Sequence, residues 1–213
     1  TYGAGGSNQE RTFALVDYLS NKIGLNTMAH YTCVNASKEK IRTDLTWLKE
    51  HGIENLMVLR GDPPKGESAF KVHPEGFAYA SDLAAFVRAG FGFCLGGAAY
   101  PEKHPEAVDL DADITNLKKK VDAGCEFLMT QLFFNNERYL DLVKRARQAG
   151  IACRIIPGII PLTAYSQIER FTRMSQTEIP QGVLDRMESY KDQPQKIYQI
   201  GMDFAISQCR DLL

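Results

Sequence analysis

Hydrophobic positions along the chain follow two alternating patterns. In some segments apolar residues recur every three or four positions, as Phe13, Val16 and Leu19 do, which is typical of a helix with one buried face. Between these segments lie short apolar runs such as Leu56–Leu59, whose length is typical of a buried strand. The pattern predicts strands at 27–33, 55–59, 92–99, 126–130 and 152–156. It predicts helices at 9–23, from a Ser37 cap to Gly52, at 79–88, 111–123 and 136–149, and from 165 onward with a break at Pro180.

The alternation of strands and helices predicts a parallel sheet with helices on its faces. Each predicted strand is almost wholly apolar, as expected when both faces of a sheet are covered. Successive strand ends are 30, 40, 31 and 26 residues apart, about one strand–helix unit each, if they are placed at His30, Arg60, Tyr100, Gln131 and Pro157. No G-x-G-x-x-G fingerprint follows a strand. These observations favour a (β/α)8 (TIM) barrel over a doubly wound sheet.

The chain is short for a barrel of this kind. A complete barrel has eight strands and typically about 250 residues, whereas this chain has 213. Five complete strands are predicted, and Thr1–Ala4 resembles the end of a sixth. We therefore expect an α/β chain that forms a single catalytic barrel domain over residues 1–213 and is incomplete at both ends.

Composition and charge argue against several classes of protein. The formal net charge is −1, so the chain lacks the basic excess of a nucleic-acid-binding protein. No apolar run approaches the roughly 20 residues that span a bilayer, so no membrane association is expected. The five cysteines are odd in number and form no C-x-x-C pair. We expect buried free thiols in a reducing compartment, the cytoplasm, and no metal site.

Polar residues cluster just past the C-terminal ends of the predicted strands. His30 and Thr32 end one strand, Arg60–Asp62 follow the next, and Tyr100 and Gln131 follow two more. Active sites of (β/α)8 barrels lie on this face. The aromatic, amide, guanidinium and carboxylate groups favour binding of a large polar heteroaromatic molecule over covalent catalysis. No phosphate-binding G-x-x-x-x-G-K-[ST] loop is present, and no lysine is placed within a strand for Schiff-base chemistry.

Six motifs follow one another in an order and spacing that resemble one enzyme family. They are TYGA at 1–4, AHYTC at 29–33, LRGDP at 59–63, AAYPEKHPEA at 98–107, TQLFF at 130–134 and IPGIIP at 156–161. The Arg-Gly-Asp segment alone carries no weight, but the complete series is very specific. Over essentially all 213 residues, the chain resembles the catalytic domain of methylenetetrahydrofolate reductases.

The resemblance implies a flavin-dependent oxidoreductase of one-carbon metabolism. Members of that family are (β/α)8 barrels that hold FAD non-covalently. They reduce 5,10-methylenetetrahydrofolate to 5-methyltetrahydrofolate with NADH or NADPH in a ping-pong cycle. By resemblance, the FAD-binding positions are Thr1, His30, Arg60, Gly61, Asp62, Tyr79, Ala80, Tyr100, His104, Asp113, Asn116 and Lys120.

Three positions are implied by the resemblance to act on the substrate. Asp62 matches a catalytic carboxylate near the flavin and the folate pterin. Gln131 matches a residue that hydrogen-bonds the pterin, and Phe171 matches an aromatic that stacks on folate or on the nicotinamide nucleotide. The family's general acid, a glutamate on the first barrel strand, and an arginine just past the last strand have no counterpart among the 213 residues.

Two alternatives stay open from the sequence alone. One is an aldolase-type or phosphate-binding barrel without flavin, and the other is a barrel that binds flavin or a partner but does not turn over. The preference for NADH or NADPH is also open, as is self-association into a homo-oligomer.

Overall fold

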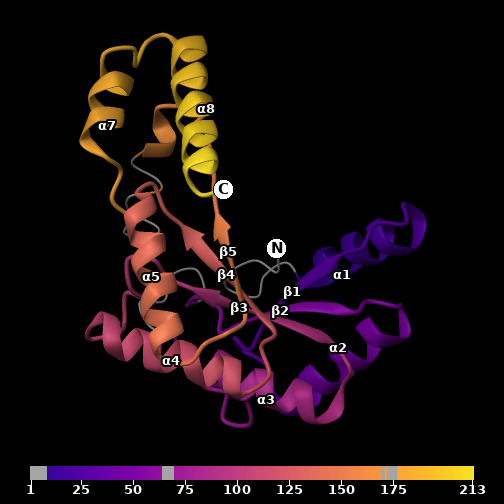
Figure 1. The fold of residues 1–213 in the computed structure, drawn as a ribbon. Helices are drawn as coiled ribbons and strands as arrows, with labels where there is room; N and C mark the ends of the chain where they lie inside the picture. The colour runs from indigo at the N-terminus through magenta and orange to yellow at the C-terminus, as the bar shows by residue number, and fades with distance from the viewer. Residues whose placement is uncertain (1–8, 64–69, 169–170, 172–176) are drawn as a thin grey trace. The chain divides into compact units, whose positions relative to one another are not determined.

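The computed structural model describes residues 9–63, 70–168, 171 and 177–213, and strands alternate with helices along them (Figure 1). The strands are β1 (Met28–Thr32), β2 (Asn55–Leu59), β3 (Cys94–Ala99), β4 (Phe127–Leu132) and β5 (Arg154–Gly158). The helices are α1 (Gln9–Asp17), α2 (Lys38–Glu50), α3 (Ala80–Gly90), α4 (Leu110–Asp122), α5 (Asn136–Gln148), α7 (Gln181–Glu188) and α8 (Pro194–Asp211). A π-helical turn, η1 (Tyr18–Lys22), continues α1, so the predicted helix at 9–23 is two successive helical segments.

The five strands form one sheet in chain order, β1-β2-β3-β4-β5. β1 pairs in parallel with β2, and β2 with β3, so that His30 lies opposite Met57 and Met57 opposite Gly96. A doubly wound sheet reverses its strand order at a switch point, whereas successive strands of a (β/α)8 barrel are neighbours throughout. The predicted fold class is confirmed: the chain has the α/β architecture of this barrel, with five parallel strands among the described residues.

Several strands differ from the prediction at their ends. β1 is one residue shorter at each end, and β3 begins at Cys94, two positions later than predicted. β4 continues to Leu132, so Gln131 lies within the strand rather than just after it. β5 begins at Arg154, two positions later than predicted. One reason is that the Arg147 guanidinium of α5 donates to the Cys153 carbonyl over 2.9 Å and so occupies an acceptor that a strand would use.

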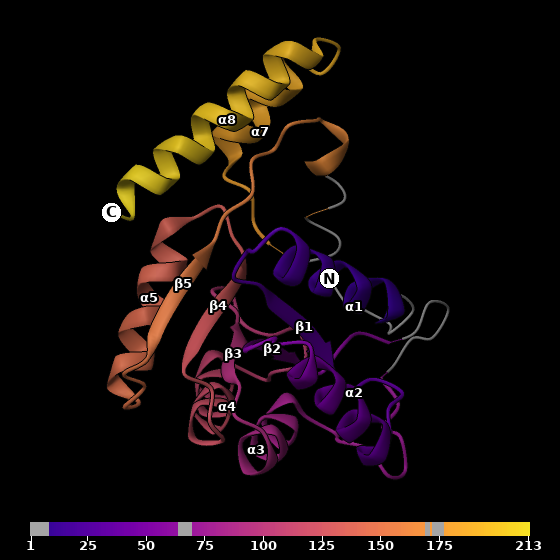
Figure 2. The same ribbon diagram turned by 90° about the vertical axis from the view of Figure 1, so that its right-hand side faces the viewer.

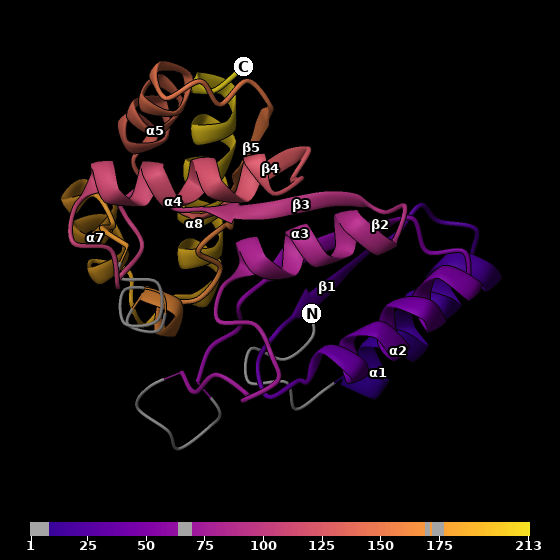
Figure 3. The same ribbon diagram turned by 90° about the horizontal axis from the view of Figure 1, so that it is seen from below.

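Residues 1–98 and 116–128 form one compact unit. Its core is a cluster of apolar side chains from β1, β2 and β3 and from α2 and α3, including Ala29, Ile41, Leu45, Leu48, Leu56, Val58, Leu83, Val87 and Leu95. In Figure 3, α1 lies behind α2 in the view from below. Phe13 of α1 stacks on Trp47 of α2 with the ring centroids 5.2 Å apart.

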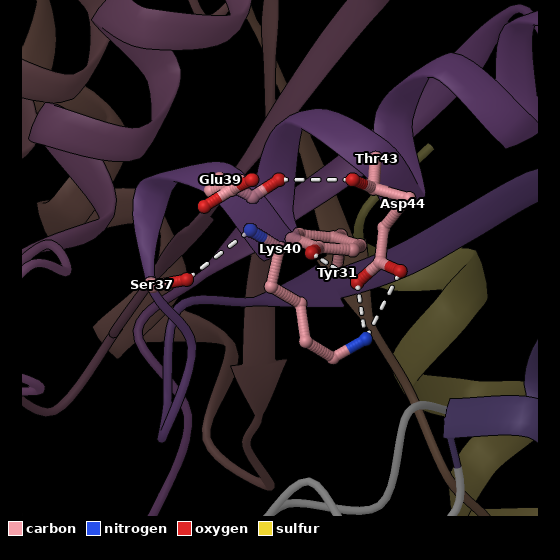
Figure 4. A network of polar contacts seen from close by, with 6 residues as sticks. All are labelled: Tyr31, Ser37, Glu39, Lys40, Thr43 and Asp44. Carbon is pink, nitrogen blue, oxygen red and sulfur yellow. Dashed lines mark hydrogen bonds and ion pairs between the residues drawn. The ribbon is translucent and has the colours of Figure 1, made fainter.

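A partly buried polar network ties β1 to α2 (Figure 4). The Tyr31 hydroxyl donates to Asp44 Oδ2 over 2.8 Å, and Lys40 Nζ lies 3.1 Å from both oxygens of that carboxylate. Ser37 caps α2 as predicted, because its Oγ accepts a hydrogen bond from the Lys40 N–H. Successive side chains of a strand point to opposite faces. Since Tyr31 points toward α2, its neighbours on either side point away from α2.

Residues 99–115 and 129–213 form a second compact unit. Within it, α7 and α8 lie side by side, as Figures 1 and 2 both show. Its apolar core includes Phe134, Leu162, Phe171, Ile179, Met187, Ile197 and Ile200. The expectation of a single domain over residues 1–213 stays a prediction.

Three findings bear on the expectations from composition. Among the described residues, no helix is both long enough and apolar enough to cross a membrane. All five cysteines are free thiols, as predicted. Cys33 and Cys125 are buried, but Cys94 and Cys153 are partly exposed and Cys209 is exposed near the end of α8, so the prediction of burial is wrong for Cys209. Within the described ranges, no group of three or more His, Cys, Asp or Glu side chains is placed to hold a metal ion.

Candidate active site

β1 presents His30 and Thr32 on the face of the sheet that points away from α2. His30 is half-buried, and burial lowers the pKa of its imidazole below the usual 6.5, so the ring is neutral at pH 7. The Thr32 side chain is 2% exposed, and its hydroxyl has no hydrogen-bond partner within the described part of the chain. A polar pair thus occupies the strand end that the sequence indicated.

The turn Arg60–Asp62 follows β2 directly and depends on Gly61. This glycine has φ +92°, in the left-handed region that side-chain-bearing residues rarely adopt. A Cβ at this position would lie 3.0 Å from Val34 Cβ and 3.1 Å from Thr32 Cβ. The turn therefore packs closely against the end of β1, and only glycine fits there without strain.

Arg60 is fixed through both its backbone and its side chain, whereas Asp62 is exposed. The Cys33 thiol donates to the Arg60 carbonyl over 3.3 Å. Burial raises the pKa of Cys33 to about 11, so the sulfur keeps the proton that it donates. The Arg60 guanidinium lies 4.8 Å from the centroid of the Phe70 ring, a cation–π contact. The Asp62 carboxylate is thus held on an ordered turn and faces solvent.

Two further predicted residues lie at the start of α3. Tyr79 is its N-cap residue, and Asp82 Oδ2 accepts a hydrogen bond from the Tyr79 N–H over 3.2 Å. The Tyr79 side chain is 62% exposed, and Ala80 is the first residue of the helix. This end of α3 offers an accessible aromatic ring and the positive end of the helix dipole.

Predicted residues Asn116 and Lys120 lie one turn apart on α4. Lys120 Nζ donates to the Ala98 carbonyl near the end of β3. Asn116 Oδ1 accepts from Lys119 Nζ over 3.1 Å, and Lys118 pairs with Asp122 on the same helix. Of the three consecutive lysines, therefore, Lys120 is directed toward a strand end, and Lys118 and Lys119 pair along their own helix.

Tyr100, His104 and Asp113 are in direct contact. The Tyr100 and His104 rings meet edge to face with centroids 4.7 Å apart. The backbone N–H of His104 donates to Asp113 Oδ2 over 2.9 Å. His104 Nδ1 accepts from the Glu106 N–H over 3.1 Å, so a neutral ring carries its proton on Nε2. The loop after β3 and the start of α4 thus bring three predicted FAD-binding residues together.

Glu102 lies between Tyr100 and His104 and links their loop to a distant segment. Its Oε2 accepts from the Glu178 N–H over 2.9 Å, while its buried Oε1 has no hydrogen-bond partner among the described residues. Burial raises the pKa of this carboxyl above its usual value. The Glu178 side chain in turn lies 3.5 Å from Arg138 of α5.

The predicted substrate-binding residues occupy different environments. Gln131 is half-buried on β4, and its Oε1 accepts from the neighbouring Leu132 N–H over 2.9 Å. Phe171 is 8% exposed and packs in the core of its unit with Phe134 and Leu162. Thr1 lies outside the described residues.

The family model named methylenetetrahydrofolate reductase matches residues 1–213. The chain belongs to the methylenetetrahydrofolate reductase family. Methylenetetrahydrofolate reductase (NADH) 1 of Zea mays is 38% identical over the complete chain, which covers 38% of the maize protein. The 5,10-methylenetetrahydrofolate reductase of Escherichia coli is 35% identical, again over the complete chain, which covers 70% of that protein.

The names of these relatives include both NADH and NADPH. A Caenorhabditis elegans protein named probable methylenetetrahydrofolate reductase (NADPH) is 38% identical over 94% of this chain, which covers 29% of that protein. This member of the family therefore spans well under half the length of its plant and animal relatives.

A solved structure shares the fold. It is described as an uncharacterized protein from Clostridium thermocellum that binds two copies of 5-methyl-5,6,7,8-tetrahydrofolic acid. It superposes with a TM-score of 0.57 and 17% identity, covering 92% of this chain and 64% of its own. At that identity, the likeness supports the fold and nothing finer.

Sequence reasoning missed two residues that hold predicted residues or their loops in place in this methylenetetrahydrofolate reductase family member. Cys33 donates to the Arg60 carbonyl in one unit, and Glu102 accepts from the Glu178 N–H in the other. Each lies inside one of the motifs that carry the resemblance, within three residues of a predicted residue. Their place in those motifs was the available signal, but their contacts depend on segments distant in the sequence.

Proposed function

We propose that this chain is the FAD-binding catalytic barrel of an enzyme that reduces 5,10-methylenetetrahydrofolate to 5-methyltetrahydrofolate with NADH or NADPH. The observation that carries the proposal is the family match over residues 1–213. The relatives' names support the reaction and both nucleotides. Nucleotide and folate would be used in turn, in a ping-pong cycle.

The predicted residues of each unit have chemistry that suits FAD. Arg60 and Lys120 of one unit are cationic, and in the other unit the His104 imidazole lies against the Tyr100 ring. Cationic and N–H donors suit a pyrophosphate, and aromatic side chains suit a heteroaromatic ring. When bound, FAD would supply the hydride-transfer chemistry, while the protein supplies binding, orientation and electrostatics. We assign its binding to the predicted residues His30, Arg60, Gly61, Asp62, Tyr79, Ala80, Tyr100, His104, Asp113, Asn116 and Lys120.

Asp62 is proposed as the catalytic carboxylate. Opening the methylene bridge of the folate gives an iminium cation, which a nearby negative charge stabilises. Asp62 is exposed, so its carboxylate is accessible to a ligand, and the close packing of the turn at Gly61 sets the position of its backbone. Gln131 is proposed to hydrogen-bond the pterin, because its side-chain amide carries both donors and an acceptor. Phe171 is proposed to stack on folate or on the nucleotide, which would require its ring to leave the core described above.

The test is spectroscopic. The purified protein should be yellow and should retain FAD on gel filtration. Under anaerobic conditions, NADH or NADPH should bleach the flavin absorbance, and added methylenetetrahydrofolate should restore it. A colourless protein that does not respond to FAD in a fluorescence titration contradicts the proposal and favours a barrel without flavin. A yellow protein whose absorbance the nucleotide bleaches but folate never restores favours a barrel that has lost turnover.

A further inference from the structure

Thr32 carries a polar group that the fold leaves without a partner. Its side chain is 2% exposed, and its hydroxyl makes no hydrogen bond within the described part of the chain. Burial of an unpaired hydroxyl costs free energy, because the water that it bonded in the unfolded chain is not replaced. Such a group in a folded protein calls for an explanation, and a bound ligand is one.

The position of Thr32 places this hydroxyl among predicted FAD-binding residues. Thr32 and His30 are two residues apart on β1 and so share the face that points away from α2. Thr32 Cβ lies 3.1 Å from the point that a Cβ on Gly61 would occupy, so the Arg60–Asp62 turn packs directly on it. His30, Thr32 and the turn all belong to the same compact unit.

The neighbours of Thr32 hold it in place without using its hydroxyl. Tyr31 is fixed to Asp44 of α2 by its own hydroxyl, and Cys33 is bonded to the Arg60 carbonyl through its thiol. The backbone on both sides of Thr32 is therefore ordered. Because a threonine hydroxyl and methyl exchange places by rotation about χ1, the oxygen can turn toward a ligand without a movement of the strand.

We propose that Thr32 is a further FAD-binding residue, whose hydroxyl bonds a polar atom of the cofactor. The inference rests on the proposed function and adds a contact to it. A hydroxyl both donates and accepts, so it matches the carbonyl and N–H edge of a flavin ring or a hydroxyl of its side chain. FAD binding would satisfy the group that the fold leaves unpaired.

The test compares three variants by FAD titration, with thermal unfolding of the FAD-free protein measured alongside. Thr32→Val keeps the shape and removes the hydroxyl, while Thr32→Ser keeps the hydroxyl. Thr27→Val is the matched control, because Thr27 lies just before the other end of β1 and its buried hydroxyl also has no partner among the described residues. We expect Thr32→Val to weaken FAD binding about tenfold, the factor that corresponds to about 1.4 kcal/mol. Thr32→Ser and Thr27→Val should bind FAD as the parent does.

The unfolding measurement separates binding from structure. The FAD-free Thr32→Val protein should unfold at or above the parent's midpoint, since an unpaired polar group is lost. Parent-like FAD affinity of a folded Thr32→Val protein overturns the inference and leaves the proposed function intact. If the parent itself binds no FAD, both fail together. If Thr32→Val does not fold, the comparison of Thr32→Ala with Thr32→Ser decides, and equal affinities overturn the inference.

Discussion

His104 owes its orientation to neighbours that lie close to it in the sequence. Its backbone N–H donates to the Asp113 carboxylate, its ring Nδ1 accepts from the backbone N–H of Glu106, and its ring meets Tyr100 edge to face. Local contacts of this kind follow from a motif, which is why the sequence could group these residues. Glu102 shows the limit, because the N–H that it accepts belongs to Glu178, 76 residues further along.

The raised pKa of Glu102 predicts a pH-dependent stability. Burial raises this pKa above 4.5 and outweighs the Glu178 N–H and the Arg138 charge, which lower it. The folded state therefore binds the proton more tightly than the unfolded state. The contribution of Glu102 to the free energy of unfolding therefore falls as pH rises from about 4.5 to the folded pKa and is constant above that. Glu102→Gln removes this titration. Its free energy of unfolding should therefore rise relative to that of the parent across the same pH range, as measured by urea unfolding at several pH values.

A matched control is Glu137→Gln, at an exposed position in the first turn of α5. The difference in free energy of unfolding between Glu137→Gln and the parent should not change with pH in the way expected for Glu102→Gln. A Glu102→Gln difference that is constant with pH would show that burial of this carboxyl has no energetic consequence.

At the scale of elements, prediction succeeded where the signal is local. Ser37 precedes α2 and caps it, as a serine at that point in a helical pattern indicates. The end of β4 was not predictable in this way, because it depends on pairing with a distant strand. The Thr130 hydroxyl, for example, accepts from the Gly158 N–H of β5 over 2.8 Å.

The contact between β1 and α2 predicts unequal effects from two partners of Asp44. Asp44 is 7% exposed and accepts from the Tyr31 hydroxyl inside the core. Lys40 approaches the same carboxylate from a side chain that is 51% exposed. Tyr31→Phe should lower the free energy of unfolding by about 1–2 kcal/mol, because a buried charged acceptor loses a donor. Lys40→Met should lower it by less than about 1 kcal/mol, as for an exposed ion pair.

Urea unfolding of both variants checks this order. If Lys40→Met costs more than Tyr31→Phe, the ion pair rather than the buried hydroxyl holds β1 to α2. In that case the cost of Lys40→Met should shrink in high salt, which screens exposed ion pairs.

At the scale of the whole chain, the strand order was predictable from the spacing of strand–helix units. The sheet runs β1 to β5 in chain order, as that spacing indicates. Side-chain environments were less predictable, since they depend on what packs around each residue. Phe171 was assigned a stacking role but is buried in an apolar cluster, and the Gln131 amide bonds its own backbone neighbour. The roles of both remain proposals.

The catalytic cycle as a whole predicts a selective effect of Asp62→Asn. The substitution keeps the shape of the side chain and removes its charge. In the proposed cycle, only the folate half-reaction passes through a cation that this charge stabilises. We expect that half-reaction to slow about tenfold or more, a loss of about 1.4 kcal/mol of transition-state stabilisation, and the nucleotide half-reaction to slow less. Anaerobic stopped-flow absorbance measures the two separately.

Asp122→Asn is the control for this comparison, because Asp122 is exposed on α4 and pairs there with Lys118. It should leave both half-reactions unchanged. Equal slowing of both half-reactions in Asp62→Asn would point to a general role in shaping the turn after β2. Gly61→Ala would then be the decisive comparison, since it strains the same turn without removing the charge, through the positive φ and the close contacts with Val34 and Thr32. If the two variants behave alike, Asp62 acts through the turn, and if only Asp62→Asn is selective for folate, it acts through its charge.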